Sequence, residues 1–91
     1  MKKEKNDDYE GIIEKPYVTE KTFNMIEREN KLTFVVSEKA TKPDIIKAMK
    51  AFYESETTNV NILRTIHGKK AIIKFSKNDG ARELATKLGI V

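Results

Sequence analysis

The stretch ATKPDIIKAMKAFY, residues 40–53, decides the fold prediction for this chain. Its apolar residues recur with the period of an α-helix and not with the two-residue period of a strand. Thr41 is a favoured N-cap residue, and Asp44 stands three positions later, at the spacing of a capping box. Pro43 falls in the first turn, where its missing N–H is tolerated. We predict a helix over residues 42–54 with an inward stripe of Ile45, Ala48, Met49 and Phe52, widened by Ile46 and Tyr53.

The opposite face of this helix is basic, because Lys42, Lys47 and Lys50 fall outside the apolar stripe. An amphipathic helix of this kind buries its apolar side against another element. Phe52 is therefore predicted to be a core residue, and its truncation to alanine is expected to cost about 3–5 kcal/mol of stability.

Strand-like runs lie on both sides of the predicted helix. Residues 31–36 alternate, and Val35 makes the second face apolar as well, which is typical of a central strand. Residues 59–66 and 69–76 are predicted to form a β-hairpin. Its turn is His67-Gly68, where the glycine supplies a positive φ.

Shorter elements complete the chain. An edge strand is predicted to begin at residues 11–13 and to stop at Pro16. Thr19 can cap a helix that ends at Asn30. The turn Asn78-Asp79-Gly80 can also supply the N-cap of a last helix, which Gly89 ends. The predicted class is α+β, a small antiparallel sheet with helices packed on it, in the order β-α-β-α-β-β-α.

The composition indicates one small globular unit with a modest basic excess. Of 91 residues, 38% are hydrophobic, which supports one core but no large active-site cavity. Lys and Arg number 18 against 14 Asp and Glu, and the net charge of +4 permits an anionic partner such as nucleic acid. Residues 1–10 are mostly charged or amide-bearing, so we expect a flexible charged tail followed by one domain over residues 11–91. Neither a signal peptide nor a membrane span is recognisable, so we expect a cytoplasmic protein without a membrane partner.

Residue types used in catalysis are scarce. Cysteine is absent and His67 is the only histidine, so the sequence offers no thiol nucleophile, histidine triad or zinc site. The carboxylates are scattered among lysines and the glycines are isolated, which predicts neither an acid–base pair nor a phosphate-binding loop. We expect no enzyme activity, no cofactor and no small-molecule substrate.

The predicted hairpin carries a group of cations. Alternation places Lys70 and Lys74 on the face away from the apolar residues of the same strand. Cations on a rigid ribbon suit phosphate contacts, which give affinity but little sequence readout. Alternatively, lysines on an edge strand protect a sheet from aggregation. The group consists of Arg64, Lys69, Lys70, Lys74 and Lys77.

The segment PYVTEKT, residues 16–22, is a second candidate site. It places Tyr17, Thr19 and Lys21 at the start of a predicted helix, where free N–H groups can hold a phosphate. The alternative is an ordinary helix cap with a surface lysine.

Stacking of RNA bases on the sheet is not expected. The sheet of an RNA-recognition motif exposes aromatic rings on its strands. Here the segment GKKAIIKF carries isoleucines instead, and Phe75 shares the inward face with Ile73. Any bound RNA would be recognised by its shape and its phosphates.

Several of these segments together resemble one family, the universal large-subunit ribosomal proteins of the L23 family. PYVTEKT resembles the N-terminal P-x-V-[ST]-E-K motif of that family. ATK at 40–42, VN at 60–61 and KKAIIKF at 69–75 resemble its later motifs, in the same order. The resemblance covers residues 12–91. The short hairpin and the final ELATKLGIV are more similar to archaeal and eukaryotic members than to bacterial ones.

The resemblance implies binding to large-subunit ribosomal RNA beside the peptide exit tunnel, on ribosomes in the cytoplasm. It also implies contact with a neighbouring ribosomal protein and docking of targeting factors such as the signal recognition particle. Together with the two candidate sites, it predicts RNA contacts by Tyr17, Thr19, Lys21, Lys39, Thr41, Lys42, Asn61, Arg64, Lys69, Lys70, Lys74 and Lys77.

The short hairpin limits how far the chain reaches. Its two turn residues span at most about 7 Å, so we expect the protein to stay at the tunnel exit. Candidates for docking the targeting particle are Glu27, Arg28 and Glu29. Two other interpretations stay open. The chain can be a free-standing interaction or regulatory module that pairs through the edge of a ferredoxin-like sheet, or, more distantly, an acylphosphatase-like enzyme.

Overall fold

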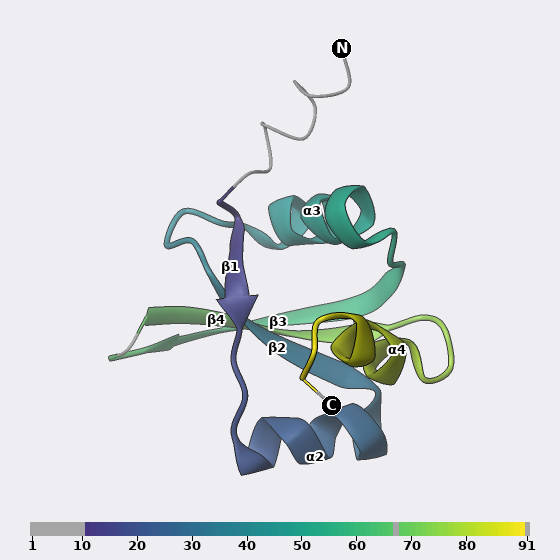
Figure 1. Cartoon of the computed structure of the whole chain (residues 1–91). Helices are drawn as coiled ribbons and strands as arrows, with labels where there is room; N and C mark the ends of the chain where they lie inside the picture. Colours follow the sequence, from purple (N-terminus) through teal and green to yellow (C-terminus); the bar gives the residue numbers. More distant parts are fainter. Residues whose placement is uncertain (1–10, 67, 91) are drawn as a thin grey trace.

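The computed structural model describes residues 11–66 and 68–90, so the predicted tail and His67 lie outside the described residues. The strands are β1 (Ile13–Pro16), β2 (Lys31–Val36), β3 (Thr57–Thr65) and β4 (Gly68–Phe75). They form an antiparallel sheet in the order β1-β2-β4-β3. The helices of this part are α2 (Glu20–Glu29), α3 (Lys42–Tyr53) and α4 (Gly80–Lys87). The predicted α+β class and order of elements are confirmed (Figure 1).

The core lies between one face of the sheet and the helices. In Figure 1, α3 is at the top, α2 at the bottom and α4 between them. Alternation along β2 and β4 turns every second side chain toward these helices, and cross-strand pairing keeps the two strands in phase, with Phe34 opposite Ala71. The buried strand residues of this core are Leu32, Phe34, Val36, Val60, Ala71, Ile73 and Phe75, and the helices add Ile26, Ile45, Met49, Ala81, Leu84 and Ala85.

Helix α3 begins as the sequence predicts. The Thr41 hydroxyl accepts a hydrogen bond from the Asp44 N–H at 3.3 Å, and the Asp44 carboxylate accepts one from the Thr41 N–H at 3.1 Å. This reciprocal capping box, with Pro43 in the first turn, fixes where the helix starts.

The prediction that Phe52 belongs to the core is wrong. Ile45, Ala48 and Met49 are fully buried, whereas Phe52 is 40% exposed and Ile46 is 43% exposed. Phe52 lies in the last turn of α3, so the helical period gives its direction but not whether an element lies beneath it. Tyr53 covers the sheet there instead, with its ring stacked 6.0 Å from that of Phe34.

Strand β4 is a central strand of the sheet, lying between β2 and β3. The interpretation of its lysines as edge protection is therefore wrong, because both edges of β4 are hydrogen-bonded. The hairpin turn is also displaced by one residue from the predicted position. Thr65 pairs with Gly68, so residues 66 and 67 form the connection, and Gly68 (φ +122°) belongs to the strand.

Asn30 joins the end of α2 to the start of α4. Its backbone has left-handed dihedrals (φ 58°), which end α2 as predicted. Its side-chain amide donates hydrogen bonds to the carbonyls of Phe75 (3.1 Å) and Lys77 (2.8 Å). Its side-chain oxygen accepts one from the N–H of Ala81 at 2.9 Å. Asp79 occupies the N-cap position of α4 without a side-chain cap bond, so Asn30 supplies the side-chain cap that was predicted from the turn Asn78-Asp79-Gly80.

Replacing Asn30 by glycine is expected to lower the free energy of unfolding by about 2–3 kcal/mol. Glycine keeps the left-handed backbone but removes three hydrogen bonds and leaves their partners unsatisfied. Asn30→Ala should cost about 1 kcal/mol more, because alanine is strained at this φ. Urea unfolding measures both, with Asn78→Ala in the exposed turn as the control. A glycine variant as stable as wild type would contradict this role of Asn30.

Candidate RNA-binding surface

The sheet face opposite the core, here called the open face, presents three rows of side chains. The rows follow from the register, because residues paired across antiparallel strands point to the same side. From the hairpin end onward, they are Lys15, Val35, Lys70 and Leu63; then Thr33, Ile72 and Asn61; then Lys31, Lys74 and Asn59. The open face is thus a mixture of lysines, asparagines and aliphatic side chains.

Lys70 is held beneath Tyr17 on this face. Its Nζ lies 4.3 Å from the centre of the Tyr17 ring and donates a hydrogen bond to Thr65 Oγ1 at 3.0 Å. Only 5% of Lys70 is exposed. The cation–π contact orients the ring on the open face, and the buried charge contributes a positive potential rather than an exposed contact point.

Helix α2 lies beside the sheet and contributes to both of its sides. Ile26 points into the core, whereas Lys21, Met25 and Arg28 lie on the opposite side of the helix. Together with Ile72 of β4 they line a groove of about 390 Å³, and the remaining lining residues are Asn24 and Glu29. The open face therefore continues onto α2, and Lys21 joins it as part of this groove.

A second groove, of about 730 Å³, crosses the end of the sheet beside the first one. Arg28 and Glu29 line both grooves, and Lys31 and Lys74 line the second. Glu29 is the only acidic residue in the two linings, and its carboxylate pairs with Lys31 Nζ at 3.1 Å. The grooves therefore have a net positive rim, which favours an anionic ligand.

Lys69 does not belong to the open face. It points to the core side and is 7% exposed. Its Nζ donates hydrogen bonds to the carbonyls of Ala40 at 2.6 Å and Glu38 at 3.2 Å. Lys69, which was predicted to contact RNA, therefore stabilises the loop before α3 instead. Arg64 points to the same side and pairs with the Glu38 carboxylate at 2.8 Å.

The other predicted contacts lie apart from the open face. Lys39, Thr41 and Lys42 are exposed around the start of α3, where the Thr41 hydroxyl serves the capping box. Lys77 lies before α4 and pairs with Glu83 at 2.9 Å. Of the twelve predicted residues, those that the structure gathers on the open face and its α2 rim are Tyr17, Lys21, Asn61, Lys70 and Lys74.

Thr19 has a structural role at the start of α2. Its hydroxyl accepts the Thr22 N–H at 3.2 Å, and the Thr22 hydroxyl accepts the Thr19 N–H at 2.8 Å. Since α2 carries Lys21 toward the groove, this capping box positions one side of the candidate surface.

Sequence reasoning did not identify Lys15, Arg28 and Lys31 as members of this surface. Lys15 faces it because β1 pairs with β2 through a bulge, which the sequence does not signal. Arg28 had been considered only for docking a targeting particle, together with Glu27 and Glu29. The structure separates these three, because Glu27 pairs with Arg82 of α4 at 3.6 Å while Arg28 lines both grooves.

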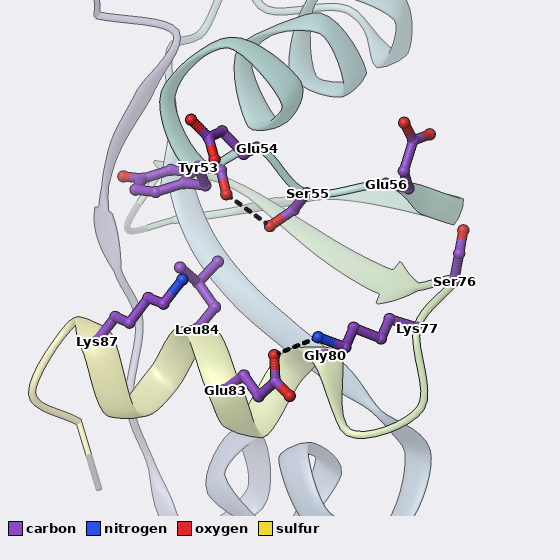
Figure 2. A pocket seen from close by; sticks show the side chains of 10 residues that line it. All are labelled: Tyr53, Glu54, Ser55, Glu56, Ser76, Lys77, Gly80, Glu83, Leu84 and Lys87. Atoms are coloured by element: carbon purple, nitrogen blue, oxygen red, sulfur yellow. Dashed lines mark hydrogen bonds and ion pairs between the residues drawn. The ribbon is translucent and has the colours of Figure 1, made fainter.

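A separate hollow of about 390 Å³ lies between the end of α3 and helix α4 (Figure 2). Some of its polar groups bind one another: the Ser55 hydroxyl donates to the Tyr53 carbonyl at 3.1 Å, and Lys77 pairs with Glu83. No nucleophile is paired with a base among its lining residues. The hollow therefore gives no support to an acylphosphatase-like reaction.

Within residues 11–66 and 68–90, no group of three acidic or histidine side chains is placed to hold a metal ion. None of the helices in this part of the chain is long and apolar enough to cross a membrane.

The comparisons with known proteins agree with the resemblance of the motifs. The family model of ribosomal protein L23 matches residues 11–90. Three archaeal proteins named large ribosomal subunit protein uL23 are similar over nearly their whole length. Those of Methanothermobacter thermautotrophicus and Methanobrevibacter smithii are 41% and 43% identical over 81 residues, 88% of this chain and 94% of each relative. That of Methanococcus aeolicus is 44% identical over 80 residues, 87% of this chain and 93% of the relative. This chain belongs to the ribosomal protein L23 family.

Proposed function

We propose that this chain is a structural protein of the large ribosomal subunit that binds ribosomal RNA through its open face. The names of its archaeal relatives support the ribosomal role. The assignment of the open face as the RNA-binding surface rests on one observation: exposed cations from separate elements lie on the same side. Lys15 of β1, Lys21 and Arg28 of α2, and Lys74 of β4 all border the same side.

These cations suit phosphate groups better than any other ligand class. They are long, exposed side chains on rigid elements, and the one carboxylate in the grooves is already paired. Contacts of this kind release counterions from RNA, so affinity falls as salt rises. Asn59 and Asn61 add amide groups beside Lys74, on the edge strand β3, and these amides can bind ribose hydroxyls or base edges.

The protein acts by binding and not by catalysis. Its family is a ribosomal one, and no nucleophile is paired with a base among the residues that line the hollow beside α4. We propose that it has no cofactor and no small-molecule substrate.

When the open face binds RNA, the opposite side of the protein, where the helices lie, remains accessible to protein partners. Exposed apolar side chains of α3, Ile46 and Phe52, lie on that side and suit a neighbouring ribosomal protein. Only residues 66 and 67 connect β3 to β4, so we propose that the chain stays at the tunnel exit. Glu27 and Arg82, which join α2 to α4, are the candidate contacts for a targeting particle.

Gradient sedimentation of the tagged protein tests the ribosomal role. The protein should travel with large subunits and leave them only at high salt, because phosphate contacts dominate its affinity. Binding of purified protein to large-subunit ribosomal RNA should give a straight line of log affinity against log salt. Protein that stays at the top of the gradient would overturn the proposal.

One feature favours a second candidate function, a free-standing interaction module. Strand β3 is a nine-residue edge strand that carries one charged residue, Arg64, and no proline. Such an edge is open to pairing with a strand of another protein. The same gradient separates the two functions, since a free-standing module would not travel with large subunits.

A further inference from the structure

The groove between α2 and β4 differs from the rest of the open face, because it combines an apolar floor with a polar rim. We propose that it accepts the base of one unpaired nucleotide of the bound RNA. This inference rests on the proposed function and adds a specific ligand to it. The lining residues are Lys21, Asn24, Met25, Arg28, Glu29 and Ile72.

The floor suits the flat, apolar face of a base. Met25 of α2 and Ile72 of β4 are half-buried, and both line the groove. The groove volume of about 390 Å³ is within the range of small-ligand sites. Methionine adapts its shape to what lies against it, which suits a planar ring system.

The rim supplies polar groups for the edge of the base. Asn24 is exposed on the same side of α2, and its amide offers both donors and an acceptor. No side-chain hydrogen bond of Asn24 occurs within residues 11–66 and 68–90, so its amide is available. The Glu29 carboxylate is engaged by Lys31 and is thereby shielded from the phosphates.

Cations stand at both ends of the groove. Lys21 and Arg28 are seven positions apart on α2, which places them on one side of the helix and about 10 Å apart along its axis. They can hold the phosphates that flank an inserted nucleotide. The second groove continues this path through Lys31 and Lys74, so the RNA backbone can follow the cations past the inserted base.

An unpaired base is the ligand that this chemistry favours. A regular RNA duplex keeps its bases stacked inside, and its phosphates alone leave the apolar floor uncovered. The open face presents no row of aromatic rings for stacking several bases, because the aromatic residues of the described strands, Phe34 and Phe75, both lie in the core. One base on an aliphatic floor is therefore expected, in place of the multiple stacking of an RNA-recognition motif.

Affinity for large-subunit ribosomal RNA, measured over a salt series, tests the inference. Ile72→Ala and Asn24→Ala are each expected to lower affinity about 3- to 10-fold at every salt concentration, with the salt slope unchanged. Leu63→Ala is the control, because Leu63 is an aliphatic residue of the same face outside the groove. Asn24 is exposed, so its variant folds even if Ile72→Ala does not.

A defined probe adds a second measurement. A short RNA duplex with one bulged nucleotide, made with each of the four bases, is compared with the same duplex without the bulge. Wild type should prefer at least one bulged duplex about 10-fold, and both groove variants should lose this preference. If wild type shows no preference while its ribosomal RNA salt slope is normal, the groove inference fails and the proposed function stands. If ribosomal RNA binding has no salt dependence, the proposed function fails as well.

Discussion

Phe34→Ala is expected to lower the free energy of unfolding by about 3–5 kcal/mol. Phe34 is fully buried in β2, opposite Ala71, and its ring stacks on Tyr53 of α3. Truncation therefore opens a cavity between sheet and helix that the rigid central strands cannot close. Urea unfolding at neutral pH, followed by circular dichroism, gives the difference.

Phe52→Ala is the matched control for this variant. It removes the same atoms from a side chain that is 40% exposed, so the expected loss is below about 1 kcal/mol. The contrast between the two phenylalanines tests the packing of α3 directly. Equal losses would show that the last turn of α3 packs on the sheet more closely than in the structure.

Replacing Lys21, Arg28 and Lys74 together by glutamine is expected to weaken binding to large-subunit ribosomal RNA about 100-fold at physiological salt. The same change should reduce the slope of log affinity against log salt by about 2–3, because each lost phosphate contact releases about one counterion fewer. All three residues are exposed and border the open face, so stability should be nearly unchanged.

Two controls accompany this triple variant. Lys47, Lys50 and Lys87 are exposed lysines of α3 and α4, and replacing them by glutamine makes the same change of net charge with little effect on the slope. Lys69→Gln should lower stability instead of RNA affinity, because it removes the bonds to the carbonyls of Glu38 and Ala40. A reduced slope for the α3–α4 variant, equal to that of the open-face variant, would contradict the assignment of the surface.

The elements that the sequence predicts well are those that local chemistry determines. Thr41 and Asp44 cap α3 within three residues of each other, and Gly89 ends α4 with hydrogen bonds from its own N–H and that of Ile90 to the last turn. Alternation correctly placed Lys70 and Lys74 on one face. None of these features depends on a distant part of the chain.

The features that the sequence did not predict depend on which elements pack against each other in the folded chain. The helical period pointed Phe52 inward, but only the tertiary arrangement shows that little lies beneath it. Alternation fixed the direction of Lys69 and Lys70, but not that the Ala40 carbonyl and the Tyr17 ring would cover their amines. The central position of β4 arises because it pairs with β2 as well as with its hairpin partner, and no local pattern encodes that choice.

The candidate RNA-binding surface, like the fold, was only partly predictable from the sequence. PYVTEKT and the hairpin supplied Tyr17, Lys21, Lys70 and Lys74, since cations and rings near a helix start or on alternating positions are visible in the sequence. The grooves were not predictable. They depend on the tertiary position of α2, which brings Met25 and Arg28 beside Ile72 and Lys74.

The three hydrogen bonds of the Asn30 side chain can form only late in translation, because they join residues that are far apart in the sequence. Its partners are made 45, 47 and 51 residues later than Asn30 itself. Strand β2 likewise lacks its main partner until β4 is available. The short, bulged β1 pairs only with the other edge of β2. A nascent chain that ends before residue 68 therefore has helices and the short β1–β2 pair, but it lacks the central strand β4 that completes the sheet. We expect such chains to stay protease-sensitive on the ribosome, and protection to begin abruptly once β4 and the first turn of α4 have left the exit tunnel.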